Sequence, residues 1–166
     1  GKLFFNPGNY CYFLELLKRC CQKYKITAIA YCLMPNHYHF LLRQDSDLSI
    51  SKFIHTLFNA YTQAIYRQQN RAGTLFEGRF RHAAVARDEY FVHLCRYIHL
   101  NPVKASLVAH PSEWPYSDYL DWIGKQKGEL GDEALVREYF PKEGSYEKFV
   151  LEYQEEMEHN SRINKY

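Results

Sequence analysis

The sequence lacks several features that would place it outside the soluble globular class. It has no run of about 18 apolar residues, so no membrane-spanning helix is expected. Residues 1–6 lack the basic-then-apolar pattern of a secretory signal. The five cysteines are odd in number and none belongs to a C-x-x-C pair. A disulfide framework and a zinc ribbon are therefore not expected, and the sequence predicts a protein of the reducing cytoplasm.

Acidic residues are scarce in the first two thirds of the chain. Residues 1–111 hold 14 Lys and Arg against 6 Asp and Glu, whereas residues 112–166 hold 7 against 13. A basic body suits a polyanion, because each phosphate contact releases condensed counterions. An unevenly charged, solvated surface would give the same balance. Aromatic residues make up 17% of the chain and include possible stacking platforms for single-stranded nucleic acid, although most of them are expected in the core.

The apolar pattern predicts one αβ domain over residues 1–110 and a helical, acidic extension over residues 111–166. The helices expected in the domain cover residues 10–24, residues 48–69 and, after a cap at Asp88, residues up to about 101, where Pro102 ends the third helix.

Strands are indicated where β-branched and aromatic residues gather. They cover residues 26–33 and 37–43, with a turn at Met34-Pro35-Asn36 between them. Residues 74–85 read as a further extended segment, broken at Gly78. In the extension, short helices are expected in parts of residues 134–140 and 146–158.

The second predicted strand carries His37 and His39. Alternate side chains of a strand share a face, so both imidazoles point the same way, while Tyr38 and Phe40 point into the opposite layer. Two imidazoles on one face can share a divalent ion. Two unrelated histidines, one buried and one exposed, would fit the same pattern.

The third predicted helix carries Tyr97 and Asn101, which lie on one face because they are four residues apart. An amphipathic surface tyrosine and a helix-ending asparagine would also explain them. Combined with the histidine pair, however, the two residues describe a coherent site. His37, His39 and the Asn101 carboxamide would hold a metal ion that polarises a scissile phosphate, and the Tyr97 hydroxyl would attack phosphorus.

Three segments in this order resemble a known family, the single-tyrosine HUH transposases and in particular the REP-associated tyrosine transposases. Residues 34–42, MPNHYHFLL, are similar to the HUH motif of that family. Residues 73–81, GTLFEGRFR, and residues 96–105, RYIHLNPVKA, are similar to further blocks of the REP-associated branch. The resemblance extends over about residues 3–119.

The resemblance implies an α+β HUH nuclease fold, a ferredoxin-like antiparallel sheet with helices on one face and the histidines on a central strand. It also implies a first strand upstream of Gly1, which would lie outside this sequence or be supplied from elsewhere. By matching position, His37, His39 and Asn101 are the expected metal ligands, for Mg²⁺ or Mn²⁺, and Tyr97 is the expected nucleophile.

The expected substrate is single-stranded DNA with REP-like hairpins, cleaved and rejoined through a 5′-phosphotyrosine with release of a 3′-hydroxyl. Such a protein would act in the cytoplasm at the nucleoid, as a monomer or a homodimer. The basic residues around the site are expected to contact phosphates, which positions DNA without reading its sequence. They are Arg71, Arg79, Arg81, Arg87 and Lys104.

Two other functions are compatible with parts of the pattern. One is a non-catalytic single-stranded nucleic-acid binder or regulator that kept the fold. The other is a partner-binding domain whose basic face meets an acidic surface. The intact set of Tyr97, His37, His39 and Asn101 favours the nuclease, because binding alone needs none of that geometry.

Overall fold

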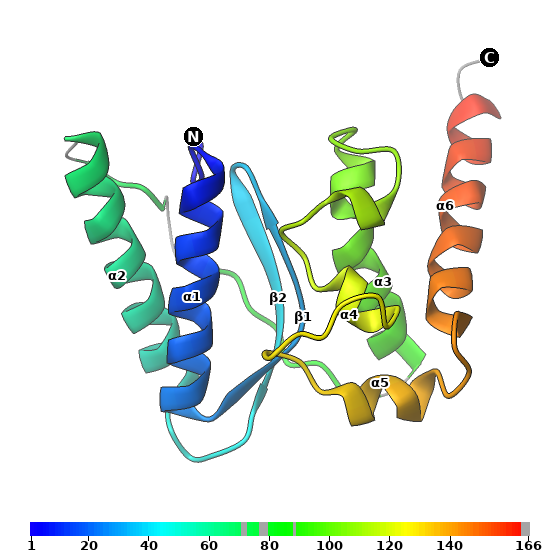
Figure 1. The fold of residues 1–166 in the computed structure, drawn as a ribbon, viewed down its shortest axis with the longest axis horizontal. Coiled ribbons are helices and arrows are strands. Elements are labelled where there is room, and N and C mark those ends of the chain that lie inside the picture. Colours follow the sequence, from blue (N-terminus) through cyan, green and yellow to red (C-terminus); the bar gives the residue numbers. More distant parts are fainter. Residues whose placement is uncertain (71–72, 77–79, 88, 164–166) are drawn as a thin grey trace.

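A two-stranded antiparallel sheet stands between two groups of helices (Figure 1). The computed structural model describes residues 1–70, 73–76, 80–87 and 89–163. Strand β1 (Ile26–Met34) pairs with β2 (His37–Gln44), with Met34 opposite His37 and Cys32 opposite His39. Both predicted strands and the α+β class are confirmed. Arg71, Arg79 and Asp88, which carried predictions, lie outside the described residues.

Helices cover both faces of the sheet. On one face lie α1 (Pro7–Tyr24) and α2 (Ile50–Gln69); on the other lie α3 (Glu89–Lys104) and the extension (Figure 1). The extension contains the 3-10 turn η1 (Pro111–Glu113), α4 (Tyr119–Trp122), α5 (Glu133–Tyr139) and α6 (Ser145–Ile163). Among the described helices, none has the combination of length and hydropathy that a membrane span requires.

The position of α3 differs from the expectation that the helices share one face. Strand β1 is almost entirely buried and contributes side chains to two hydrophobic clusters. Tyr31 and Leu33 pack with α1 and α2, whereas Cys32 and Met34 pack with α3 and the extension. A strand with apolar side chains on both faces needs cover on both, and α3 supplies the second layer.

The helices begin at capping residues. Asn6 precedes α1 and accepts a hydrogen bond from the backbone N–H of Asn9 at 3.0 Å, so this helix starts earlier than predicted. Ser49 caps α2 in the same way, through the N–H of Lys52 at 3.4 Å. The apolar spacing placed both helices, but it missed the first turn of α1 and began the second helix at residue 48, two residues before the start of α2.

The prediction that Pro102 ends the third helix was wrong, because α3 continues to Lys104. Proline lacks the N–H that would bond to the Ile98 carbonyl. The Asn101 side chain compensates for this loss: its Nδ2 donates to the carbonyls of Tyr97 at 2.9 Å and of Ile98 at 3.4 Å. The helix therefore tolerates proline in its last turn.

The segment predicted to be extended forms no strand in its described parts, residues 73–76 and 80–87. Its described beginning is instead fastened to α2. The hydroxyl of Tyr66 bonds to the Gly73 carbonyl and accepts a hydrogen bond from the N–H of Leu75 at 3.1 Å. Side-chain contacts thus replace the ladder that the β-rich composition had suggested.

The extension runs along the outer edge of β1. The N–H of Leu33 donates to the Tyr116 carbonyl at 2.9 Å, and the N–H of Asp118 donates to the Tyr31 carbonyl at 3.3 Å. Further along, the N–H of Ala28 donates to the Leu130 carbonyl at 3.1 Å. These bonds satisfy backbone groups that a free strand edge would leave unpaired.

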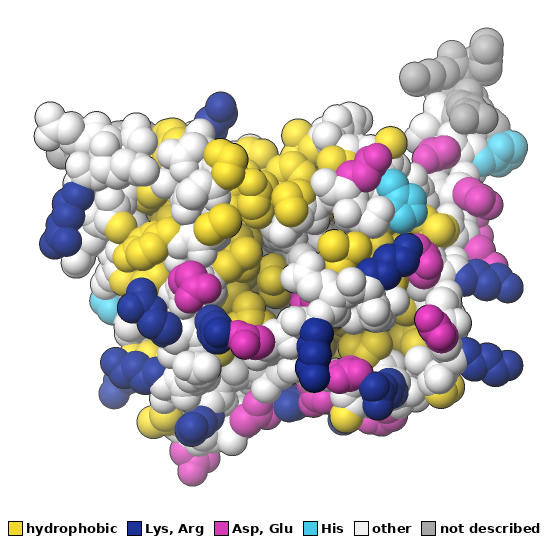
Figure 2. Space-filling model, viewed as in Figure 1, with side chains coloured by type: hydrophobic (Ala, Val, Ile, Leu, Met, Phe, Trp, Pro, Cys, Tyr) yellow, Lys and Arg dark blue, Asp and Glu magenta, His cyan; other side chains and the backbone are white. Residues whose placement is uncertain are grey.

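Charge is mixed on the face seen in Figure 2. Hydrophobic side chains are exposed between α1 and the residues after α3, while basic and acidic side chains alternate along the lower edge. Acidic side chains also lie along α6 (Figure 2). The basic excess of residues 1–111 therefore does not form a single-sign surface on this side.

Asp121 of α4 gives a testable pH dependence of stability. Burial and the nearby Asp118 raise the pKa of Asp121 to about 6, and its Oδ1 is buried without a hydrogen-bond partner. A pKa raised on folding gives stability that is complete below the unfolded pKa, 3.8, and is lost as pH rises through about 6.

Asp121→Asn should therefore stabilise the protein at pH 7.5 by about 1–2 kcal/mol, with the gain shrinking toward pH 4.5. Thermal or urea unfolding at the two pH values measures the difference. Glu155→Gln, on the exposed side of α6, is the charge-matched control. A gain that is equal at both pH values would show that ionisation of Asp121 is not its cause.

Candidate active site

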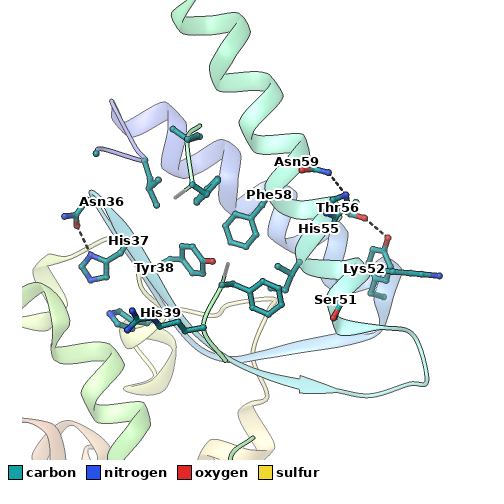
Figure 3. A pocket seen from close by; sticks show the side chains of 18 residues that line it. Asn36, His37, Tyr38, His39, Ser51, Lys52, His55, Thr56, Phe58 and Asn59 are labelled. Atoms are coloured by element: carbon teal, nitrogen blue, oxygen red, sulfur yellow. Dashed lines mark hydrogen bonds between the residues drawn. The ribbon is translucent and has the colours of Figure 1, made fainter. Parts of the chain in front are cut away.

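The two histidines of β2 lie on one side of the strand, and Tyr38 lies on the other (Figure 3). The ring centroids of His37 and His39 are 5.0 Å apart, with the planes at 89°. Tyr38 instead packs on Phe58 of α2, at 4.6 Å between ring centroids. The alternation expected from the sequence is present, and it turns both imidazoles toward α3.

His37 sits at the start of β2 and is held by the preceding residue. Its Nδ1 is 2.7 Å from the Asn36 Oδ1 (Figure 3). A carboxamide oxygen only accepts, so this bond fixes the ring with its proton on Nδ1 and leaves the Nε2 lone pair available. Partial burial also lowers the pKa of His37 from its ordinary value.

His39 is the more enclosed of the two rings. Its Nε2 is buried and has no hydrogen-bond partner. Burial, together with the neighbouring His37 and the Lys104 ammonium, lowers the pKa of His39 to about 4, although the Asn101 side chain acts in the opposite direction. The imidazole is therefore neutral at physiological pH. A buried, neutral, unpartnered ring nitrogen is suited to bind a cation.

Tyr97 of α3 faces this pair. Its ring lies edge-on to His39, with 5.7 Å between centroids and 85° between planes. The side chain is 43% exposed, so a large substrate can reach the hydroxyl. One chain thus brings a strand histidine and a helix phenol together across 58 residues of sequence.

Asn101 completes the group one helical turn after Tyr97. It is only 8% exposed, and its Nδ2 is committed to the carbonyls of Tyr97 and Ile98. The carboxamide oxygen is then the atom left to face the site, and the side chain is close enough to His39 to affect the pKa of that ring.

The ammonium group of Lys104 lies over the ring of Tyr97. Its Nζ lies 4.3 Å from the centroid of the Tyr97 ring and 5.8 Å from that of Tyr153 on α6. Burial lowers the pKa of Lys104, and the nearby Arg96 lowers it further. The cation is therefore held at the edge of the candidate site by rings from α3 and the extension.

Arg96 and His93 turn toward α6 and away from the tyrosine. The guanidinium of Arg96 lies 4.2 Å from the Phe149 ring centroid and 4.0 Å from that of Tyr153. His93 contacts Arg96 through its Nδ1 at 2.9 Å. Both side chains therefore pack against α6.

A groove of about 1260 Å³ begins at the histidines and runs between β2, α2 and the segment after α2 (Figure 3). Aromatic side chains and polar side chains of α2 line it together, among them Tyr38, Phe58, Phe76, Lys52, His55 and Asn59. Tyr97, Asn101 and Lys104 are not part of this lining. The histidines thus lie between the groove and the tyrosine.

The basic residues expected to bind phosphate occupy different surroundings. Arg81 lines the groove. Arg87 forms an ion pair with Glu138 at 2.8 Å and lies over the Tyr139 ring, so the extension holds it. Arg71 and Arg79 are outside the described residues. Of the described residues in this set, only Lys104 lies against the tyrosine.

No pattern in the sequence distinguishes His99 from the other histidines, yet the structure places it at the centre of a buried network. Its Nε2 is 2.8 Å from Asp118 Oδ1, and its Nδ1 is 2.6 Å from the Tyr146 hydroxyl. All three side chains are at most 3% exposed. The partners lie 19 and 47 residues away, and no spacing rule links residues at such separations.

The described residues contain no group of three His, Cys, Asp or Glu side chains placed to hold a metal ion. A cation bound at the two histidines would therefore depend on the Asn101 oxygen for a third ligand from the protein. Such a site would leave positions open to substrate oxygens.

The family model of IS200-like transposases matches residues 4–101, which is more than half of the chain. The chain therefore belongs to the family of IS200-like transposases. The matched region ends at Asn101 and includes both histidines and Tyr97.

Individual relatives lie in the REP-associated branch. A Haemophilus influenzae protein named as a REP-associated tyrosine transposase is 26% identical over 117 residues, which cover 64% of this chain and 66% of that protein. The chain thus spans slightly less than two thirds of this relative.

A solved structure of a REP-associated tyrosine transposase bound to a REP hairpin aligns with a TM-score of 0.62 and 19% identity, over 76% of this chain and 78% of that one. At this identity the likeness establishes a shared fold. Together with the family match, these relatives confirm the resemblance found in the sequence.

Proposed function

We propose that this protein is a transposase-type endonuclease that cleaves and rejoins single-stranded DNA near hairpins through a covalent bond to Tyr97. The observation that supports this most directly is the contact between Tyr97 and His39, 5.7 Å between ring centroids, beside a buried imidazole nitrogen without a partner. The solved relative bound to a REP hairpin supports the choice of hairpin DNA.

The residues present fit a divalent metal ion. His37 and His39 each offer a neutral ring nitrogen, and Asn101 offers an oxygen while its nitrogen is engaged elsewhere. The Asn36 contact to His37 is the kind of outer partner that orients a metal-binding imidazole. Mg²⁺ or Mn²⁺ bound there would polarise the scissile phosphate and neutralise part of its charge.

The chemistry assigned to the protein is phosphoryl transfer to a phenol. The Tyr97 oxygen, having given its proton to solvent, attacks phosphorus, and the bond from phosphorus to the 3′ oxygen breaks. The 3′ oxygen leaves and takes a proton from water. Rejoining reverses these steps when a 3′-hydroxyl attacks the phosphotyrosine. Lys104 stabilises the negative charge that accumulates beside the Tyr97 ring.

The groove next to the histidines suits a single strand better than a rigid duplex. Bases can stack on aromatic rings such as Phe58 and Phe76, while Lys52 and Arg81 meet the backbone phosphates. Because the groove ends at His37 and His39, a strand lying in it would bring a phosphate toward the candidate site.

The proposal is tested by incubating the protein with hairpin-bearing single-stranded DNA and Mg²⁺ or Mn²⁺. We expect a protein–DNA adduct that survives denaturation, forms only with metal, and releases a fragment with a free 3′-hydroxyl. Denaturing gels with DNA labelled at either end detect both products. Hairpin binding without any adduct, over a range of hairpins and metals, would favour the non-catalytic binder instead.

A further inference from the structure

His99 is fixed on both sides of its ring inside the protein. One arrangement of protons satisfies both partners: Nε2 donates to the Asp118 carboxylate and Nδ1 accepts from the Tyr146 hydroxyl. Burial raises the pKa of Tyr146, which keeps its hydroxyl protonated as the donor. A fully paired polar network in a closed interior allows few alternative orientations of its members.

This network extends well beyond the helix that carries His99. Asp118 Oδ1 also accepts a hydrogen bond from the backbone N–H of Tyr31 in β1 at 2.7 Å. Its Oδ2 accepts one from Trp122 Nε1 at 3.2 Å, and the same indole nitrogen lies 3.0 Å from the Ile29 carbonyl. The Asp118 end is thereby anchored to the strand that pairs with β2. Tyr146, in the first turn of α6, closes the other end.

The geometry of an α-helix connects this anchor to the candidate site. Successive residues are about 100° apart around the axis, so His99 lies about 200° from Tyr97, on nearly the opposite side. Tyr97 and Asn101 share the face that meets the histidines. Fixing the His99 ring therefore fixes the rotation of α3 about its axis, which determines where the Tyr97 hydroxyl and the Asn101 oxygen point.

Among the described residues, Tyr97 itself has few contacts that could fix the rotation of α3. Its ring is 43% exposed and meets His39 by an edge and Lys104 by a face. Both are weak contacts at a partly exposed ring, so they hold the helix less firmly than the buried network behind it does. The position of the phenol depends on how the rest of α3 is held.

We infer that Asp118 and Tyr146, both in the extension, are positioning residues that set the rotation of α3 through His99 and so align Tyr97 and Asn101 with the two histidines. This assigns residues 111–166 a part in strand cleavage and rests on the function proposed above. In this role Asp118 and Tyr146 act from the side of α3 opposite Tyr97.

The test compares two substitutions of buried tyrosines in the same hydrophobic cluster. Tyr146→Phe removes the hydroxyl that bonds to His99. Tyr119→Phe removes a hydroxyl that is equally buried but has no hydrogen-bond partner, and it keeps the ring that packs on His99 at 5.7 Å between centroids. It therefore changes the core without breaking a hydrogen bond of the network. Both proteins are assayed at a temperature where circular dichroism shows them fully folded.

Two readouts separate positioning from mere stability. With saturating hairpin DNA, Tyr146→Phe should slow formation of the Tyr97 adduct by about 10- to 100-fold while the DNA affinity is unchanged, because small misplacements of reacting groups have effects of that size. In NMR spectra without metal or DNA, the cross-relaxation between the Tyr97 and His39 rings should weaken. Tyr119→Phe should match the wild type in both.

Equal adduct rates and equal ring contacts in both variants would overturn the inference, as would a loss that appears only in DNA affinity. If Tyr146→Phe does not fold, Asp118→Asn decides by the same readouts, since it keeps the side-chain shape but weakens the bond to His99. If the wild type gives no adduct, the proposed function fails, and the NMR contact alone then supports or refutes the positioning role.

Discussion

Replacing Tyr97 with phenylalanine should abolish the covalent adduct and leave hairpin binding intact. The change removes one oxygen and keeps the ring that packs against His39 and beneath Lys104. Loss of a nucleophile from a site that works as a unit typically costs at least about 1000-fold in rate. DNA affinity depends instead on phosphate and base contacts, which this substitution leaves in place.

The measurement is single-turnover adduct formation on denaturing gels, paired with a filter-binding or anisotropy titration of the same hairpin. Tyr12→Phe is the matched control, because Tyr12 is also a partly exposed tyrosine but lies on α1. An adduct that persists in Tyr97→Phe at the wild-type rate would assign the nucleophile to another residue.

His39→Ala should have the next largest effect, a fall in metal-dependent cleavage of at least about 100-fold. It removes a proposed ligand from the more enclosed position, and the protein should remain folded. The Nε2 of His39 is buried without a partner, so the substitution breaks no hydrogen bond of that atom. It also removes an unpaired polar atom from the interior, whose burial destabilises the folded protein.

Titration of Mn²⁺ against the cleavage rate, together with direct Mn²⁺ binding followed by electron paramagnetic resonance, checks the assignment. His159→Ala, on the exposed side of α6, is the control. Metal affinity and cleavage that are both unchanged in His39→Ala would remove the histidine pair from the proposed site. Unchanged affinity with lost cleavage would give His39 a role other than metal binding.

The sequence was informative wherever a local rule decides structure. The β-branched and aromatic residues around the Met34-Pro35-Asn36 turn placed both strands, and the period of two placed both histidines on one side. Spacing of four residues placed Tyr97 and Asn101 together on a helix. The prediction that these two pairs meet rested on three motifs in a known order, because neither pair by itself shows where the other lies.

Other features depend on contacts that no local pattern encodes. The composition of residues 74–85 favoured an extended segment, but strand formation also needs a partner edge, and its described parts have none. The continuous apolar character of residues 26–34 could have indicated a strand covered on both faces. His99 could not have been distinguished from the other histidines, because its partners lie on elements distant in sequence.

The pairing of Asn101 with Pro102 makes two neighbours interdependent. An imino acid leaves the Ile98 carbonyl without its backbone donor, and the amide nitrogen of the preceding side chain fills that vacancy. Turning the carboxamide over would break this repair and the bond to the Tyr97 carbonyl at once. The missing backbone N–H of Pro102 thus fixes the orientation of the Asn101 carboxamide, with its nitrogen toward the helix backbone and its oxygen toward the candidate site. Substituting Asn101 would leave the Ile98 carbonyl without a donor, and substituting Pro102 would remove the need that holds the Asn101 amide in this orientation.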